Sequence, residues 1–184
     1  MKLQRLIEDL LDYQRAVHAA ASLEVSTVQL DALVRQVADQ HRLAALAKGQ
    51  KVALELTPAV VEADAVKLRS IVDNLIGNAV KFTPGGGTIT VRAHEADGKA
   101  IIEVIDSGPG VPPVEREAVF ESFFRGRAKA GGRVAGSGLG LAIAREYVEA
   151  HGGRIALVAE GPGGHFRVTL PKRPALLAAL EAAA

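Results

Sequence analysis

The 184-residue sequence contains no cysteine and no tryptophan, and aromatic residues make up only 4% of it. The absence of cysteine excludes a disulfide framework, a zinc site with thiolate ligands and a thiol nucleophile. A formal net charge of +1 gives no electrostatic basis for nucleic-acid binding. No apolar run approaches the roughly 20 residues that span a bilayer, and no signal peptide opens the sequence. We therefore expect a soluble globular protein in a reducing compartment.

The apolar residues, 48% of the sequence, recur with periods that predict both helices and strands. Asp64 is expected to cap one helix, and Asp97 with Gly98 is expected to form a tight turn between two strands. The predicted helices cover residues 2–20, 30–48, 65–82 and 138–150, with a further helical tail over 174–184. The predicted strands cover residues 24–28, 51–56, 88–94, 100–105, 155–159 and 165–170. This order favours an α+β fold with helices on one face of a mixed sheet.

Three polar residues stand on one face of the predicted 65–82 helix. Asn74, Asn78 and Lys81 are spaced four and three residues apart, so their side chains project from the same side, at the edge of the apolar face. A carboxamide oxygen suits Mg²⁺, and an ammonium suits a phosphate group. By themselves, the three residues fit an ordinary solvated helix face better than a binding site.

A carboxylate follows the predicted 100–105 strand directly, in the run Asp106-Ser-Gly108-Pro-Gly110. Glycines at this point let the backbone come close to a ligand, and the carboxylate can accept a hydrogen bond from an exocyclic amine such as that of adenine. Taken alone, the run is better explained as a tight turn.

A glycine-rich run, Gly136-Ser-Gly138-Leu-Gly140-Leu, opens the predicted 138–150 helix. Small residues at a helix N-terminus expose backbone N–H groups that can bind phosphate. The run lacks the third glycine of the dinucleotide-binding fingerprint, and no Gly-Lys-Ser/Thr of a P-loop follows it. A flexible connector is the simpler explanation of this run in isolation.

The order and spacing of these runs together resemble the sensor histidine kinases, within the superfamily that includes DNA gyrase B, mismatch-repair ATPases and a heat-shock chaperone. The resemblance extends over residues 2–171. The five runs that carry it are similar to the N box (74–84), the G1 box (106–110), the F box (120–125), the G2 box (136–141) and the third glycine box (161–164) of that family. It implies the two-layer α/β sandwich called the Bergerat ATP-binding fold, preceded by an N-terminal helix.

The resemblance also implies ATP and Mg²⁺ as cofactors and a role for each motif residue. Asn78 would hold the metal, and Asn74 and Lys81 would act on the phosphates during catalysis. Residues 125–137 would form a mobile lid whose base is anchored by Phe123 and Phe124. The nucleotide would be bound by Asn74, Asn78, Lys81, Phe82, Asp106, Gly108, Gly110, Phe124, Arg125, Gly136, Gly138, Leu139 and Gly140.

The resemblance divides the chain into three parts and implies its partners. Residues 1–22 would be the end of the second helix of a dimerisation hairpin, residues 23–171 the catalytic domain, and residues 172–184 an Ala/Leu-rich tail. The partners would be ATP or ADP, the protein's own dimerisation domain with its acceptor histidine, a response regulator and a second protomer, without nucleic acid. The domain would be cytoplasmic, in a protein anchored in the inner membrane.

Two departures from the family pattern are visible. Gly164 stands where many relatives have Ser or Thr, which would remove a polar contact near the adenine. The acceptor histidine of the family is followed by Asp or Glu, whereas His18 is followed by Ala and His41 by Arg. We therefore expect no autophosphorylation of this chain on histidine.

The expected reaction is transfer of the ATP γ-phosphoryl group to a histidine of the dimerisation domain. A hydrolytic relative needs a carboxylate base one helical turn before the metal-binding Asn, and Asn74 cannot accept a proton from water. Two alternatives remain: a serine kinase of the anti-sigma type, which the dimerisation-like helix at 2–20 disfavours, and a nucleotide-binding module without catalysis, which the intact motifs disfavour.

Overall fold

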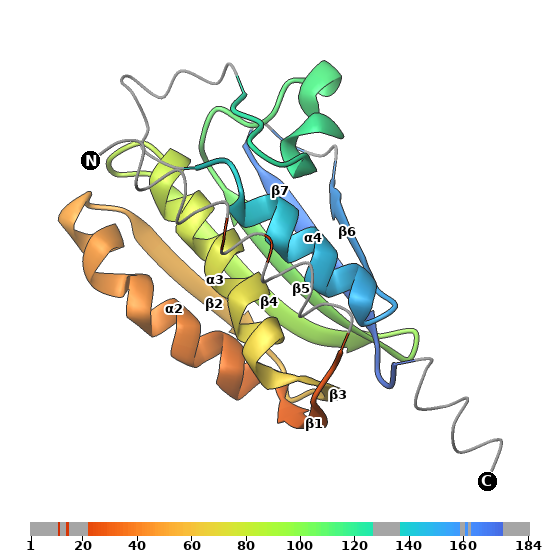
Figure 1. The fold of residues 1–184 in the computed structure, drawn as a ribbon. Helices are drawn as coiled ribbons and strands as arrows, with labels where there is room; N and C mark the ends of the chain where they lie inside the picture. The colour runs from red at the N-terminus through yellow and green to blue at the C-terminus, as the bar shows by residue number, and fades with distance from the viewer. Residues whose placement is uncertain are drawn as a thin grey trace, which may run out of the picture.

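The computed structural model describes residues 22–126, 137–158, 161 and 163–174, together with the isolated Leu11 and Gln14. Within these residues, a five-stranded mixed sheet has the order β2-β4-β5-β7-β6, in which only β2 and β4 run parallel. Figure 1 shows α2, α3 and α4 on one face of this sheet. The strands are β2 (Lys51–Leu56), β4 (Thr88–Ala96), β5 (Lys99–Asp106), β6 (Arg154–Leu157) and β7 (His165–Pro171), and the helices are α2 (Leu30–Ala47), α3 (Ala65–Phe82) and α4 (Gly140–Ala150).

The predicted α+β class and two-layer architecture are confirmed, and most element boundaries agree within two residues. Asp64 caps α3 as expected, because its carboxylate accepts the N–H groups of Val66 and Lys67. No described helix is long and apolar enough to cross a membrane. The predicted 2–20 helix and the predicted 174–184 tail lie outside the described residues, apart from Leu11, Gln14 and Pro174.

The start of the last helix was predicted two residues too early. Gly138 has a φ of +79°, outside the helical region, and α4 begins only at Gly140. The left-handed turn brings Gly138 against the backbone of the F-box run, where its carbonyl accepts the N–H of Phe123 at 3.0 Å. A Cβ on Gly138 would lie 2.7 Å from the carbonyl oxygen of Phe124, so the close approach requires glycine.

A second, two-stranded sheet pairs β1 (Val25–Gln29) with β3 (Val60–Asp64) in antiparallel register. The sequence analysis predicted a strand at 24–28 but missed β3, whose Val-Val-Glu-Ala-Asp run follows Thr57 and Pro58 without clear alternation. Val61 and Ala63 are buried on this strand, and it ends on the residue that caps α3. Two short 3-10 turns, η1 (Pro113–Glu115) and η2 (Ala118–Phe120), were also not predicted.

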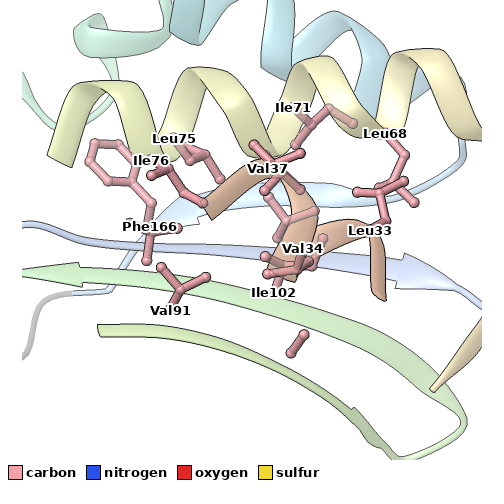
Figure 2. Packing of buried hydrophobic residues seen from close by; sticks show 14 of the residues in the cluster. Leu33, Val34, Val37, Leu68, Ile71, Leu75, Ile76, Val91, Ile102 and Phe166 are labelled. Atoms are coloured by element: carbon pink, nitrogen blue, oxygen red, sulfur yellow. The ribbon is translucent and has the colours of Figure 1, made fainter. Parts of the chain in front are cut away.

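The hydrophobic core lies between the sheet and its three helices. Figure 2 shows Leu68, Ile71 and Leu75 of α3 pointing toward side chains of the sheet and of α2. The predicted core face of α3 is confirmed, since Leu68, Ile71, Val72 and Leu75 are fully buried and Ala79 is 3% exposed. The face of α3 about 100° away is thereby left to project toward the space beside α4 and the end of β5.

Candidate functional site

A cavity of about 660 Å³ opens where the C-terminal half of α3, the end of β5 and the start of α4 meet. This volume is in the range of small-molecule and cofactor sites. Ten of the predicted site residues line the cavity: Asn74, Asn78, Lys81, Phe82, Asp106, Gly110, Phe124, Arg125, Gly138 and Gly140. The fold therefore brings together motifs that are 66 residues apart in the sequence, from Asn74 to Gly140.

The α3 side of the cavity presents polar groups that are not paired with the protein. Among the described residues, the carboxamide of Asn78 and the ammonium of Lys81 make no hydrogen bond or ion pair; Lys81 Nζ lies 4.8 Å from the ring centroid of Phe82. Asn74 is different, because its Nδ2 donates to the carbonyl of Ser70 at 2.9 Å, one turn back. Its Oδ1 packs against the α-carbon of Gly140, where any side chain would collide with it.

The electrostatics of this side favour an anion. Burial lowers the pKa of Lys81, and the nearby guanidinium of Arg125 lowers it further. Both effects disfavour the charged ammonium in the empty cavity. An anion bound near both cations would offset the repulsion between Arg125 and Lys81 and would pair with the Lys81 ammonium. This end of the cavity is therefore suited to phosphate.

The β5 side presents a single buried carboxylate. Asp106 is 9% exposed, and its Oδ1 accepts the N–H groups of Gly108 at 2.8 Å and Gly164 at 3.3 Å. Oδ2 accepts no hydrogen bond from the described residues. Burial raises the pKa of Asp106, and the two backbone hydrogen bonds oppose that rise. The carboxylate is thus oriented through one oxygen, while the other is available to a donor in the cavity.

Small residues make this orientation possible. Side chains at Gly163 and Gly164 would collide with the backbone and the carboxylate of Asp106, so both positions require glycine in this conformation. Gly108 is confined in the same way, since a Cβ there would lie 3.1 Å from the carbonyl oxygen of Phe82. The structure therefore supplies a reason for Gly164 in place of the expected Ser or Thr: without a Cβ, its backbone can approach the Asp106 carboxylate closely and donate its N–H to Oδ1.

Residues 63–174 match the family described as histidine kinase-, DNA gyrase B-, and HSP90-like ATPase. The chain belongs to this ATPase family. The match begins at the end of β3 and continues past β7, so it includes every described wall of the cavity.

Similar proteins include the sensor histidine kinase GlrK of Escherichia coli K12, which is 39% identical over 170 residues. That alignment covers 92% of this chain but only 36% of GlrK, so the chain spans about a third of this relative's length. The full-length structure of ShkA in complex with AMPPNP is similar with a TM-score of 0.78 and 35% identity, covering 92% of this chain and 36% of ShkA. Histidine kinase ThkA in complex with the response regulator TrrA is similar with a TM-score of 0.76 and 25% identity, covering 95% of this chain and 48% of ThkA.

Two of the predicted site residues that the structure describes do not line the cavity. The N–H of Gly108 donates to Asp106 Oδ1, and Leu139, which directly precedes α4, is 2% exposed. Gly136 lies outside the described residues, as does most of the predicted lid. The expected anchoring of the lid base is visible only at its two ends, where Phe123 and Gly138 are hydrogen-bonded.

Part of the apolar wall of the cavity was not predicted from the sequence. The residues that were missed include Val111, Val119, Leu141 and Phe166. Phe166 packs edge-on against Phe120 of the F-box run, with ring centroids 6.1 Å apart and planes at 87°. Leu141 ends the G2-box run, whereas the other three lie outside every motif; of these, Phe166 could have been found from the alternation in the predicted 165–170 strand, which places it on the core face.

Proposed function

We propose that this chain is the ATP-binding catalytic domain of a sensor histidine kinase, which transfers the γ-phosphoryl group of ATP to a histidine on a dimerisation domain. One observation carries the proposal: a single cavity combines a buried carboxylate with a free acceptor oxygen at one side and an unpaired carboxamide and ammonium at the other. Family membership and the nucleotide complex of ShkA support it.

Asp106 would recognise the adenine. Its Oδ2 would accept the 6-amino group, while Gly108 and Gly164 hold Oδ1 in place. The apolar residues Val119 and Phe166 line the same cavity and would exclude water from the flat faces of the base. Phe82 and Gly110 complete the lining on this side.

The α3 side would hold the phosphates. Lys81 would pair with them as a point charge, and the first N–H groups of α4, which have no helical partners, would donate to them beside Gly138 and Gly140. Arg125 lines the cavity near Lys81 and adds positive charge. Positioning and neutralisation of this kind are the main contribution that proteins make to phosphoryl transfer.

A magnesium ion fits the residues present. The described residues contain no group of three or more His, Cys, Asp or Glu side chains that could hold a metal alone. Asn78 offers an unpaired carboxamide oxygen beside the phosphate end, which suits an ion that takes few protein ligands and completes its shell with phosphate oxygens and water. Bound there, Mg²⁺ would neutralise charge that develops on the phosphates.

The cavity face of α3 favours transfer to a protein over hydrolysis. It carries Asn74, Asn78 and Lys81 but no carboxylate, so α3 presents no base to activate water. His41 does not line the cavity; its Nε2 lies 2.8 Å from Asp73 Oδ1 on the surface of α2 and α3. The acceptor would therefore come from elsewhere, as the sequence of residues around His18 and His41 also indicates.

The remaining parts of the proposal concern the whole protein. Residues 1–22 would belong to the dimerisation hairpin, residues 23–171 to the catalytic domain and residues 172–184 to a tail. The protein would act as a homodimer on a response regulator, as the ThkA–TrrA complex suggests by similarity. The domain would be cytoplasmic in a membrane-anchored kinase.

Calorimetry with Mg-AMPPNP tests the nucleotide assignment. Asp106→Asn retains an oxygen for Gly108 and Gly164 but turns an N–H donor toward the adenine amine, so we expect at least tenfold weaker binding, about 1.4 kcal/mol. A purine nucleotide without the 6-amino group should bind the wild type and Asp106→Asn with much closer affinities. Asn78→Ala should weaken AMPPNP binding when Mg²⁺ is present but not when EDTA removes it. If the variant binds AMPPNP as tightly as the wild type in the presence of Mg²⁺, the metal assignment is contradicted.

Phosphoryl transfer is tested by incubating the chain with labelled ATP and candidate dimerisation hairpins. We expect acid-labile phosphate on the hairpin and none on the chain alone. Acid-stable phosphate would indicate a serine kinase, and binding without transfer to any hairpin would indicate a regulatory module. Label on His18 or His41 would contradict the expectation that the acceptor lies outside this chain.

A further inference from the structure

The last turn of α3 is held from outside the cavity by the connection between α2 and β2. Lys48 Nζ donates to the carbonyls of Val80 at 2.7 Å and Lys81 at 3.1 Å. Gln50 Nε2 donates to the carbonyls of Val80 at 3.1 Å and Thr83 at 2.6 Å. The last carbonyls of a helix have no partner within it, and here two side chains from another element supply the missing donors.

This clamp, Lys48 with Gln50, is tied to the chain that follows α3 by backbone hydrogen bonds as well. The N–H of Gly86 donates to the carbonyl of Lys48 at 3.0 Å, and the N–H of Lys51 donates to the carbonyl of Gly87 at 2.9 Å. Gln50 is only 6% exposed, so its amide is fixed between the two segments. Lys48 is exposed and adds a positive charge at the negative end of the α3 dipole.

The clamped turn is the one that carries the phosphate-side groups. The carbonyl of Lys81 accepts a hydrogen bond from Lys48 Nζ, while the ammonium of Lys81 lies in the cavity beside Phe82. A lysine side chain has four rotatable bonds, and Lys81 has no hydrogen-bond partner among the described residues to orient it. Its aim therefore depends on the backbone position at the end of α3, which the clamp sets.

The adenine side is supported differently. Ser107 Oγ accepts the N–H of Thr88 at 2.8 Å, and the N–H of Ser107 donates to the carbonyl of Thr88 at 3.0 Å, which fixes the residue next to Asp106. The Lys48 side chain makes no hydrogen bond with this support; its ammonium donates to the carbonyls of Val80 and Lys81. A change at Lys48 should thus be felt at one side of the cavity more than at the other.

We propose that Lys48 and Gln50 are positioning residues that hold the end of α3 so that the ammonium of Lys81 meets the phosphates of the bound nucleotide. The inference rests on the proposed nucleotide-binding function and extends it to residues that lie outside the cavity and outside every motif of the sequence analysis. A purely structural role for the clamp would lower stability without favouring one ligand over another.

The first test is ligand discrimination, measured on the 184-residue chain with Lys48→Met. We expect Mg-AMPPNP binding to weaken about fivefold to tenfold, which is the effect of one net hydrogen bond, and adenosine binding to change less than about twofold. Lys48→Arg should restore most of the affinity, because it keeps a cationic donor. Lys51→Met is the matched control, since it removes the same charge from an exposed residue at the start of β2 and should leave both affinities unchanged.

The second test needs no nucleotide, and it separates failure of this inference from failure of the proposed function. In the ligand-free chain, Lys48→Met should speed amide hydrogen exchange at the end of α3, over residues 80–83, and not near its start at residues 66–69. Unchanged exchange at 80–83 overturns the inference, whether or not the wild type binds nucleotide. Equal losses of AMPPNP and adenosine affinity also overturn it, whereas a wild type that binds neither ligand contradicts the proposed function.

Discussion

The two ends of α3 use similar polar residues for opposite purposes. At its start, Asp64 accepts N–H groups from Glu24, Val66 and Lys67 and is ion-paired with the ammonium of Lys67, which also donates to the carbonyl of Ser22. At its far end, Asn78 and Lys81 lack such partners among the described residues and face the cavity. Paired polar groups fasten the chain, and unpaired ones remain available to a ligand.

Two of the buried carboxylates, Asp64 and Asp106, show the same contrast in their acidity. The pKa of Asp64 is lowered, because its hydrogen bonds and the Lys67 ammonium outweigh the burial that would raise it. The pKa of Asp106 is raised, because burial outweighs its two backbone hydrogen bonds. Asp64 therefore contributes stability in its ionised form, whereas the ionised form of Asp106 reduces stability until a ligand donates to it.

The largest expected effect comes from breaking the paired end with Lys67→Met. The substitution leaves the carboxylate of Asp64, whose side chain is 4% exposed, without its counter-ion. Removing one partner of a buried ion pair costs about 3–5 kcal/mol of unfolding free energy, and urea unfolding should show a loss of this size. Lys99→Met, at an exposed strand end, should cost little. An equal loss of unfolding free energy in both variants would mean that the buried Asp64–Lys67 pair stabilises the chain no more than an exposed lysine does.

Much of the cavity end of α3 could be predicted from the sequence, because its functional residues belong to short sequence motifs. The spacing of Asn74, Asn78 and Lys81 fixes one helix face, and Asp106 directly follows an apolar strand. These are local patterns, and local patterns survive without knowledge of the fold. The predicted helix over 65–82 coincides with α3 for the same reason.

The paired end could be predicted only in part. Asp64 was recognised as a cap, but its links to Glu24 and to His151 join residues 40 and 87 positions apart, which no local pattern reveals. The same applies to Lys48 and Gln50, whose side chains donate to carbonyls 32 and 30 residues away, respectively. Side-chain bonds to backbone carbonyls place no demand on the identity of the partner residue, so the sequence leaves no sign of them.

A smaller effect is expected from His151, which joins the paired end to the end of α4. Its Nε2 accepts the N–H of Asp64 at 3.0 Å, so Nδ1 carries the proton and donates to the carbonyl of Tyr147 at 2.6 Å. Burial lowers the pKa of His151 below its ordinary value of 6.5; the Tyr147 carbonyl and the Asp64 carboxylate favour the charged ring, and the Lys67 ammonium disfavours it.

Because the folded pKa of His151 is lowered, folding excludes its proton, and the associated stability is present above the unfolded pKa and lost as pH falls below it. Urea unfolding should thus show stability declining from about pH 7.5 to about pH 5.5, more steeply in the wild type than in His151→Gln. His94→Gln is the matched control, since it removes a partly exposed imidazole from β4 that makes no hydrogen bond with the described residues. Parallel pH profiles for wild type and His151→Gln would contradict the assignment of the acceptor nitrogen.

The smallest expected change in stability comes from Asp106→Asn, which alters the buried carboxylate of the cavity. The amide keeps an oxygen for the N–H groups of Gly108 and Gly164 and removes a buried charge that has no counter-ion among the described residues. We expect a gain on the order of 0.5 kcal/mol near neutral pH, small because the two backbone N–H groups offset part of the cost of burying the charge. Since the folded pKa is raised, the cost of the charge disappears as pH falls through that pKa, and the two proteins should become equally stable in acid.

Asp64→Asn, the same substitution at the paired end, should instead destabilise the chain near neutral pH. Urea unfolding of both variants decides: a loss of stability in Asp106→Asn as large as that in Asp64→Asn would show that the carboxylate of the cavity is held for the fold and not for a ligand.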